Sequence, residues 1–251
     1  FSENLSFIPV DLRYGPRGAM YVCDWYNPVK GHAQYSLRDP RRDRKSGRIW
    51  RIVPAGATLQ DPPKIADAPI EHLLEKLKRP EYRYRYWTKR ELRDRDADKV
   101  AGALDAWVKD LDKSDPRYRH HQVEAIWAYR GIGVRRPYLL AEVIDCENHQ
   151  ARAAATRQLR HWHGSYADDG MVHLLNSAND SNGIVRMEAV NAASYIGTPK
   201  ALAAVIASLD KPMGDHLKYA TSCALGSESS SQHWQGDEEL NERIPAFLKS
   251  A

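Results

Sequence analysis

Apolar and polar residues follow two different patterns along this chain. Over residues 7–24 they alternate, and the turn sequence Gly15–Gly18 divides the stretch into two halves. A period of two is typical of strands, so this stretch predicts a β-hairpin. A third strand is predicted at Gly47–Val53, although the alternation around Trp50 is imperfect.

After Ala66 the apolar residues recur at intervals of three and four, which predicts helices. Five segments of eight residues align with one another, each opening with a cation and ending on an apolar residue. They are Arg85–Leu92, Arg119–Ile126, Arg152–Leu159, Arg186–Ala193 and Lys218–Leu225. Their first residues lie 34, 33, 34 and 32 positions apart. The sequence therefore contains an internal repeat with a period of these lengths.

A second apolar helix is predicted upstream of each repeat. These helices cover Ile70–Leu77, Val100–Leu111, Arg136–Ile144, Asp169–Ala178 and Pro199–Leu209. Two helices in a period in the low thirties predict an α-solenoid, in which stacked neighbours build a continuous core. Within it, Asp180–Gly197 is HEAT-like, with an acidic turn before a helix that contains small residues at Ala189 and Ala192. A last helix at Asp237–Lys249 is expected to cap the array.

The predicted fold class is mainly α, with a short β-sheet segment in front of a HEAT-like solenoid. Residues 1–55 form the β part, residues 56–66 a linker, and residues 67–251 about five helix pairs plus the capping helix. Three strands bury too little area to stand alone. We therefore expect them to complete a larger sheet or to pack on the solenoid.

Composition and charge limit the kinds of partner that the protein is expected to bind. The chain has 251 residues, of which 42% are hydrophobic and 28% are charged. It contains no run of about eighteen apolar residues, the length that a membrane-spanning helix needs. The net charge of +4 is mild. Arginines alternate with aromatic residues at Arg79–Asp96, a pattern that nucleic-acid-binding proteins also show. Acidic residues such as Glu91 are mixed in, which fits intrahelical ion pairs, so no nucleic-acid partner is expected.

No motif predicts a cofactor. The cysteines, Cys23, Cys146 and Cys223, are isolated, and no CxxC or CxxCH occurs. The pattern therefore offers neither a cysteine zinc site nor a c-type haem attachment site. A catalytic triad, a phosphate loop and a dinucleotide fingerprint are likewise not found. The histidines at 120–121 and 161–163 are expected at the surface or at an interface.

The richest chemistry lies between the second and third predicted strands. A loop this long is often functional. Oxygen ligands suited to Ca²⁺ are offered by Asp24, Asn27, Asp39 and Asp43. His32 could act as a general base or a metal ligand. A stacking platform for a sugar or a planar cofactor could be formed by Trp25, Tyr26 and Tyr35.

Each of these loop residues also has a structural interpretation. Asp24 could cap a turn, and the aromatic side chains could fill a gap between layers of sheet. Asp39 and Asp43 could pair with the neighbouring arginines, which are Arg38, Arg41, Arg42 and Arg44. The sequence leaves these alternatives open.

The segments PVDLRYGPRGAMYVCDWYNPVKGH, RDPRRDRKSGRIWRI and YRYRYWTKRELRDRD resemble the PVC-type (planctomycete and verrucomicrobial) membrane-bound dehydrogenase or haem-binding proteins. The resemblance implies a large exported protein with a β-propeller, a HEAT-like array and, commonly, a c-type cytochrome domain. Residues 1–55 would then be the last propeller blade. A haem or quinone would lie elsewhere in the full-length protein, which would be periplasmic or otherwise exported.

On this resemblance the loop lies on the ligand-bearing face of the propeller. The expected catalytic contacts are His32 and Asp24. The expected substrate-binding residues are Trp25, Tyr26, Asn27, Tyr35, Arg38 and Arg42, and the metal candidates are Asp39 and Asp43. The chain would be the C-terminal part of a dehydrogenase or electron-transfer protein whose solenoid docks proteins or other domains. The alternative is a non-enzymatic scaffold, and the sequence leaves open whether the chain belongs to an enzyme.

Overall fold

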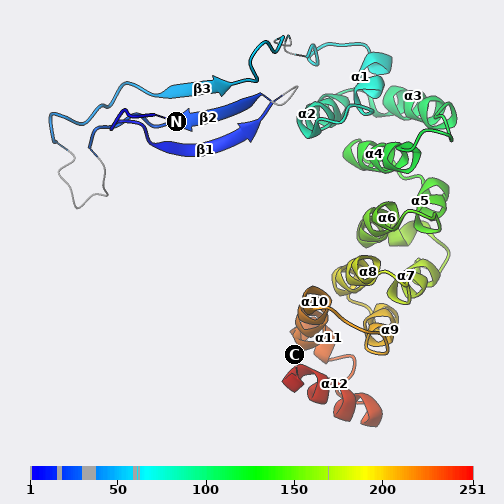
Figure 1. Cartoon of the computed structure of the whole chain (residues 1–251). Helices are drawn as coiled ribbons and strands as arrows, with labels where there is room; N and C mark the ends of the chain where they lie inside the picture. Colours follow the sequence, from blue (N-terminus) through cyan, green and yellow to red (C-terminus); the bar gives the residue numbers. More distant parts are fainter. Residues whose placement is uncertain are drawn as a thin grey trace.

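A computed structural model describes residues 2–15, 19–29, 38–58, 61, 63–168 and 170–250. Figure 1 shows a small sheet at the N-terminal end and a long curved array of helices that follows it. The protein is mainly helical, as the apolar periodicity predicts.

The sheet is antiparallel and consists of β1 (Pro9–Tyr14), β2 (Met20–Asp24) and β3 (Arg48–Ile52), in that order. Leu12 lies opposite Val22, which lies opposite Trp50, so these three side chains share one face. Ile49 falls on the other face and is 72% exposed, which explains the imperfect alternation in β3. The predicted hairpin and third strand are confirmed.

The helices form two rows, with the even-numbered row on the concave side of the array (Figure 1). The outer row is α1 (Ile70–Lys76), α3 (Ala97–Lys109), α5 (Pro137–Ile144), α7 (Met171–Ala178) and α9 (Pro199–Ser208). The inner row is α2 (Tyr82–Arg93), α4 (Tyr118–Gly131), α6 (His149–Trp162), α8 (Gly183–Ile196) and α10 (Asp215–Gly226). Each inner helix packs on the next. All five predicted repeats lie in this row, so the solenoid prediction is confirmed.

Short elements complete the array. The 3-10 helix η2 (His163–Ser165) follows α6, and the short α11 (Glu228–Ser231) follows α10. The final helix, α12 (Glu238–Ser250), packs on α10 and buries Ile244 completely. It closes the open end of the core, as expected for a cap.

The hydrophobic core runs through the helical array from Leu73 to Ile244. Leucines from successive outer helices, such as Leu104, Leu140 and Leu174, are fully buried. In α8, Ala189 and Ala192 are also fully buried and allow close packing between neighbouring helices. Within the described chain, no strand residue joins this core cluster.

The repeated cation at the start of each inner helix joins successive repeats. Arg152 donates to the carbonyls of Cys146 (3.0 Å) and Glu147 (3.1 Å) in its own repeat, and to the carboxylate of Asp180 in the next (2.8 and 3.0 Å). Arg186 likewise donates to the carbonyls of Asp180 and Ser181 and to that of Pro212, 2.6 Å away in the following turn. Arg85 makes the same kind of contact with the carbonyls of Arg79 and Pro80, so in three repeats the cation satisfies carbonyls of the preceding turn.

Candidate functional site

Asp24 ends β2, and its carboxylate is fully buried at the edge of the long loop. One oxygen accepts from the backbone N–H groups of Ile8 and Tyr26, both at 2.9 Å. The other accepts from Arg48 Nε (2.8 Å) and Trp50 Nε1 (3.0 Å). Burial by itself would raise the pKa of Asp24, but the hydrogen bonds, that of Trp50 first, lower it to about 2. The group is therefore a carboxylate at neutral pH with both oxygens engaged.

Arg48 holds the aromatic side chains around this carboxylate. Its guanidinium lies 3.8 Å from the ring centroid of Tyr26 and 5.0 Å from that of Trp50. Tyr26 adopts a positive φ of 51°, which a non-glycine residue rarely does, and the hydrogen bond that its backbone N–H donates to the carboxylate of Asp24 holds it there. Trp25 remains 47% exposed.

The rest of the described loop is held by local polar contacts. Asn27 is buried and donates to the carbonyl of Asp43 at 3.1 Å. Arg41 binds Asp39 through Nε (3.1 Å) and Nη2 (2.8 Å), and these bonds lower the pKa of Asp39 to about 2. Asp43 accepts from the backbone of Lys45 and of Ser46, both at 2.9 Å, and its pKa is lowered by the same bonds.

The structure brings some predicted site residues together and leaves others unplaced. Asp24, Trp25, Tyr26 and Asn27 meet at the end of β2, whereas His32 and Tyr35 lie outside the described residues. In the described ranges, no group of three or more histidine, cysteine or acidic residues is placed to hold a metal ion. The catalytic, substrate and metal roles of these residues remain predictions. Sequence reasoning missed Arg48 and Trp50, because only the strand register places them against Asp24.

An open pocket of about 560 Å³ lies along the second half of the loop. It is lined by Arg38, Asp39, Pro40, Arg42, Asp43, Arg44, Lys45 and Ser46. Arg42 has two buried nitrogens, Nε and Nη2, without a hydrogen-bond partner in the described structure. The predicted substrate residues Arg38 and Arg42 thus face one common space.

The inner row of helices presents aromatic and arginine side chains to solvent. On α2, Tyr82 stacks on Tyr86 with centroids 6.0 Å apart, and Trp87 meets Tyr86 edge-on at 5.3 Å. Arg90 lies 5.0 Å from the ring centroid of Trp87, and Arg83 lies 5.9 Å from that of Tyr86. We call this stripe the α2 aromatic face.

The α2 aromatic face borders a mostly apolar pocket of about 540 Å³ where the sheet approaches the array. The pocket is lined by Arg13, Tyr14 and Gly15 from the end of β1, by Pro63, and by Glu81, Tyr82, Arg83, Tyr84 and Trp87. Tyr14 is 71% exposed. Aromatic walls with cations at the rim are typical of protein-binding surfaces.

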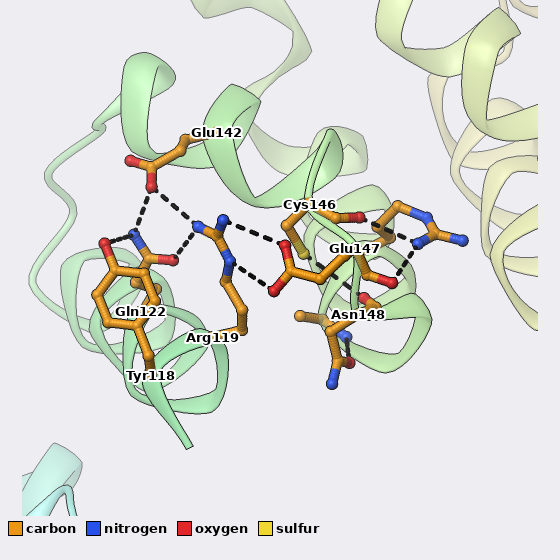
Figure 2. Close-up of polar contacts among 9 residues, drawn as sticks. Tyr118, Arg119, Gln122, Glu142, Cys146, Glu147 and Asn148 are labelled. Carbon is orange, nitrogen blue, oxygen red and sulfur yellow. Dashed lines mark hydrogen bonds and ion pairs between the residues drawn. The ribbon is translucent and has the colours of Figure 1, made fainter. Parts of the chain in front are cut away.

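Further along the array, side chains of α4 form a polar network with α5 and with the turn that connects α5 to α6 (Figure 2). Arg119 donates to Glu142 and Gln122, both at 2.9 Å, and pairs with Glu147 at 3.3 Å. Gln122 also donates to the hydroxyl of Tyr118 at 3.1 Å. The network supports one wall of a polar groove of about 660 Å³ that Trp127, among others, lines. The groove walls are therefore preorganised.

Comparison with known protein families gives two matches. Residues 1–56 match a domain of unknown function, DUF7133, and residues 136–226 match HEAT repeats. No curated protein matches the chain. The HEAT match covers α5 to α10 and agrees with their paired packing, so the class of the helical part is a HEAT-like solenoid. In the described chain, no helix combines the length and apolar character that crossing a bilayer requires.

Proposed function

We propose that the helical array is a protein-docking module whose inner face binds a partner protein or another domain. The observation that supports this most directly is the exposure of Tyr82, Trp87 and Arg90 on one helix face. Tryptophan, tyrosine and arginine dominate the binding energy of protein interfaces. HEAT repeats are interaction modules, and solenoids bind along their concave surfaces.

The charge pairing of the inner face supports the same function. Glu124 on α4 is buried and pairs with Arg85 at 2.7 Å and with Lys89 on α2. Lys89 in turn lies 4.9 Å from the ring centroid of Trp127. These contacts fix the side chains before a partner arrives, which lowers the entropy cost of binding.

Site-specific photo-crosslinking tests the docking function. A photoreactive residue replaces Tyr86 or Trp127 on the inner row, and Tyr138 or Val172 on the outer row serves as the matched control. All four variants are expressed in the source cells. We expect discrete protein adducts from the inner positions only, because the outer positions face solvent away from the concave side. Equal yields from both rows would refute an inner docking face.

We propose as a second, more specific function that the chain is part of an exported propeller–HEAT protein with a dehydrogenase or electron-transfer role. The sheet supports this, because β1 is exposed along its whole length and Leu12 and Tyr14 leave apolar surface uncovered. Such a sheet fits a propeller blade that neighbouring blades would cover. Cell fractionation of the full-length protein tests export, with recovery in the cytoplasmic fraction arguing against it.

Dye-linked oxidation of sugars by the full-length polypeptide tests the redox role. We expect turnover by the wild type and a loss of turnover in the His32→Ala and Arg42→Ala variants. Wild-type rates in the His32→Ala variant would remove His32 from any catalytic role. An inactive wild type that still gives the inner-face crosslinks would leave the scaffold function alone standing.

A further inference from the structure

Four side chains from three successive repeats lie near one another at the C-terminal ends of the inner helices. Arg130 comes from α4, Arg160 and His161 from α6, and Tyr195 from α8 (helices in Figure 1). The guanidinium of Arg160 lies 4.7 Å from the ring centroid of Tyr195, and its Nε donates to His161 Nε2 at 2.9 Å. We call these four residues the Arg160 cluster.

The Arg160 cluster holds like charges together. Burial lowers the pKa of Arg130, and the charge of Arg160 lowers it further. Burial also lowers the pKa of His161, and the charges of both arginines add to that effect. In the described chain, no carboxylate forms an ion pair with Arg130 or Arg160. Bringing two cations together without a counter-charge costs free energy, which a bound anion would recover.

Neighbouring arginines on the same face show the contrast. Arg157, three residues before Arg160, binds the buried carboxylate of Glu188 on α8. Arg119, on the same helix as Arg130, binds Glu142 and Glu147. Those arginines join repeats, whereas Arg130 and Arg160 have no such acidic partner. The carbonyls at helix C-termini offset part of a positive charge, but only about half a unit per helix.

We propose that the Arg160 cluster binds an acidic segment of the partner protein, with carboxylates on Arg130 and Arg160 and an apolar residue against Tyr195. This inference rests on the docking function proposed above. Arginine forms bidentate bonds with carboxylates, and Nε of Arg160 is already held by His161, which leaves its two Nη groups to face a ligand.

The spacing of the cluster fits an extended peptide. Packed helices lie roughly 8–10 Å apart, and an extended chain advances about 3.3–3.6 Å per residue. Carboxylates three residues apart would therefore reach arginines on adjacent helices. A protein segment is favoured over nucleic acid because other cations of this face are already paired: Glu124 binds Arg85 and Lys89, and Glu188 binds Arg157. A continuous row of phosphates needs a continuous row of available cations, whereas two spaced carboxylates need only Arg130 and Arg160.

Fluorescence anisotropy with defined probes tests the proposal. The probe is a labelled nonapeptide with glutamate at every third position and alanine between, and its control carries glutamine in place of glutamate. We expect the folded full chain to bind the glutamate peptide at least ~10-fold more tightly than the glutamine peptide, and less tightly as salt rises. Arg130→Glu and Arg160→Glu should each weaken binding by ~10-fold or more.

Lys200→Glu is the matched control variant, because Lys200 is an exposed cation on the outer α9. It makes the same charge change and should leave the affinity within about twofold, since screening weakens distant surface charges. Arg160→Gln serves as a second variant that adds no negative charge, and circular dichroism checks that each variant is folded. If the arginine variants do not fold, the two peptides compared on the wild type still decide the question.

Three outcomes would overturn the inference. The two peptides could bind equally, or Arg160→Glu could bind as the wild type does. A labelled ten-nucleotide oligothymidylate could bind through Arg130 while the glutamate peptide does not, which would make the ligand a nucleic acid. If the inner-face crosslinks persist while the glutamate peptide fails, the docking function stands and only the acidic partner is wrong. Loss of the crosslinks would refute the docking function itself.

Discussion

Asp24 shows how a single buried charge can organise a loop. Removing a carboxylate from water is costly unless every oxygen finds donors. Asp24 has four donors, two from backbone N–H groups and two from side chains on β3. It therefore joins the start of the chain, the end of β2 and the third strand, and positions Tyr26 and Trp50 around Arg48.

The lowered pKa of Asp24 predicts a pH dependence. The ordinary value is 3.8 and the folded value is about 2, so the stabilisation is complete above about pH 5 and disappears as pH falls towards about 2. We expect the amide protection factors of Ile8 and Tyr26 to fall over this window. In Asp24→Asn, protection should already be low at neutral pH and change little on acidification.

Hydrogen exchange followed by NMR measures this effect. Asp11→Asn is the control, because Asp11 is on the same sheet and is exposed. Protection of the two amides that stays constant down to about pH 2 in the wild type would contradict the prediction.

At the residue scale, the sequence predicts which residues form the site better than it predicts the contacts that they make. It singles out Asp24, Tyr26 and Asn27, and it offers the pairing of Asp39 with a neighbouring arginine, which the structure shows to be Arg41. The partners of Asp24 across the sheet do not follow from the sequence, because a shift of one residue in register would turn Arg48 and Trp50 to the opposite face.

At the scale of elements, the repeated cations that join neighbouring helices should make a measurable contribution to the free energy of unfolding. The side chains of Arg152 and Asp180 are mostly buried, with 17% and 12% exposed. Replacing Arg152 by Met leaves the carboxylate of Asp180 and the carbonyl of Cys146 without this donor. We expect the free energy of unfolding to fall by about 2–3 kcal/mol.

Urea denaturation followed by circular dichroism measures the effect. Arg93→Met is the control, because Arg93 pairs with Asp94 at the surface, where both side chains are more than half exposed. That substitution should change the free energy of unfolding by at most about 0.5 kcal/mol. Equal losses for the two variants would mean that the cation of the repeat does not join neighbouring helices.

Element positions are the part of the fold that the sequence predicts best. A helix repeated at a fixed period must present the same face to its neighbours, so the alignment of the opening cations locates every inner helix. The sequence does not show which cations remain without an acid. Arg157 and Arg160 are of the same type and lie on the same helix, and only the position of Glu188 on α8 separates their roles.

The whole molecule divides into a part with a core and a part without one. The helical array buries a continuous apolar cluster, whereas β1 is exposed throughout and β3 has no buried residue. The two parts approach each other at the pocket between the end of β1 and α2. Stability should therefore reside in the helices, and the sheet should depend on whatever covers its apolar face.

Truncation tests this division. A fragment of residues 63–251 should keep its helical circular dichroism and unfold cooperatively near the urea midpoint of the full chain, because the core cluster begins at Leu73. The control is residues 2–236, which lacks α12. Losing the fully buried Ile244 exposes the end of the core, so this fragment should be less stable by about 2 kcal/mol or more. If the first fragment lost cooperative unfolding while the second kept it, the sheet rather than the capping helix would complete the core.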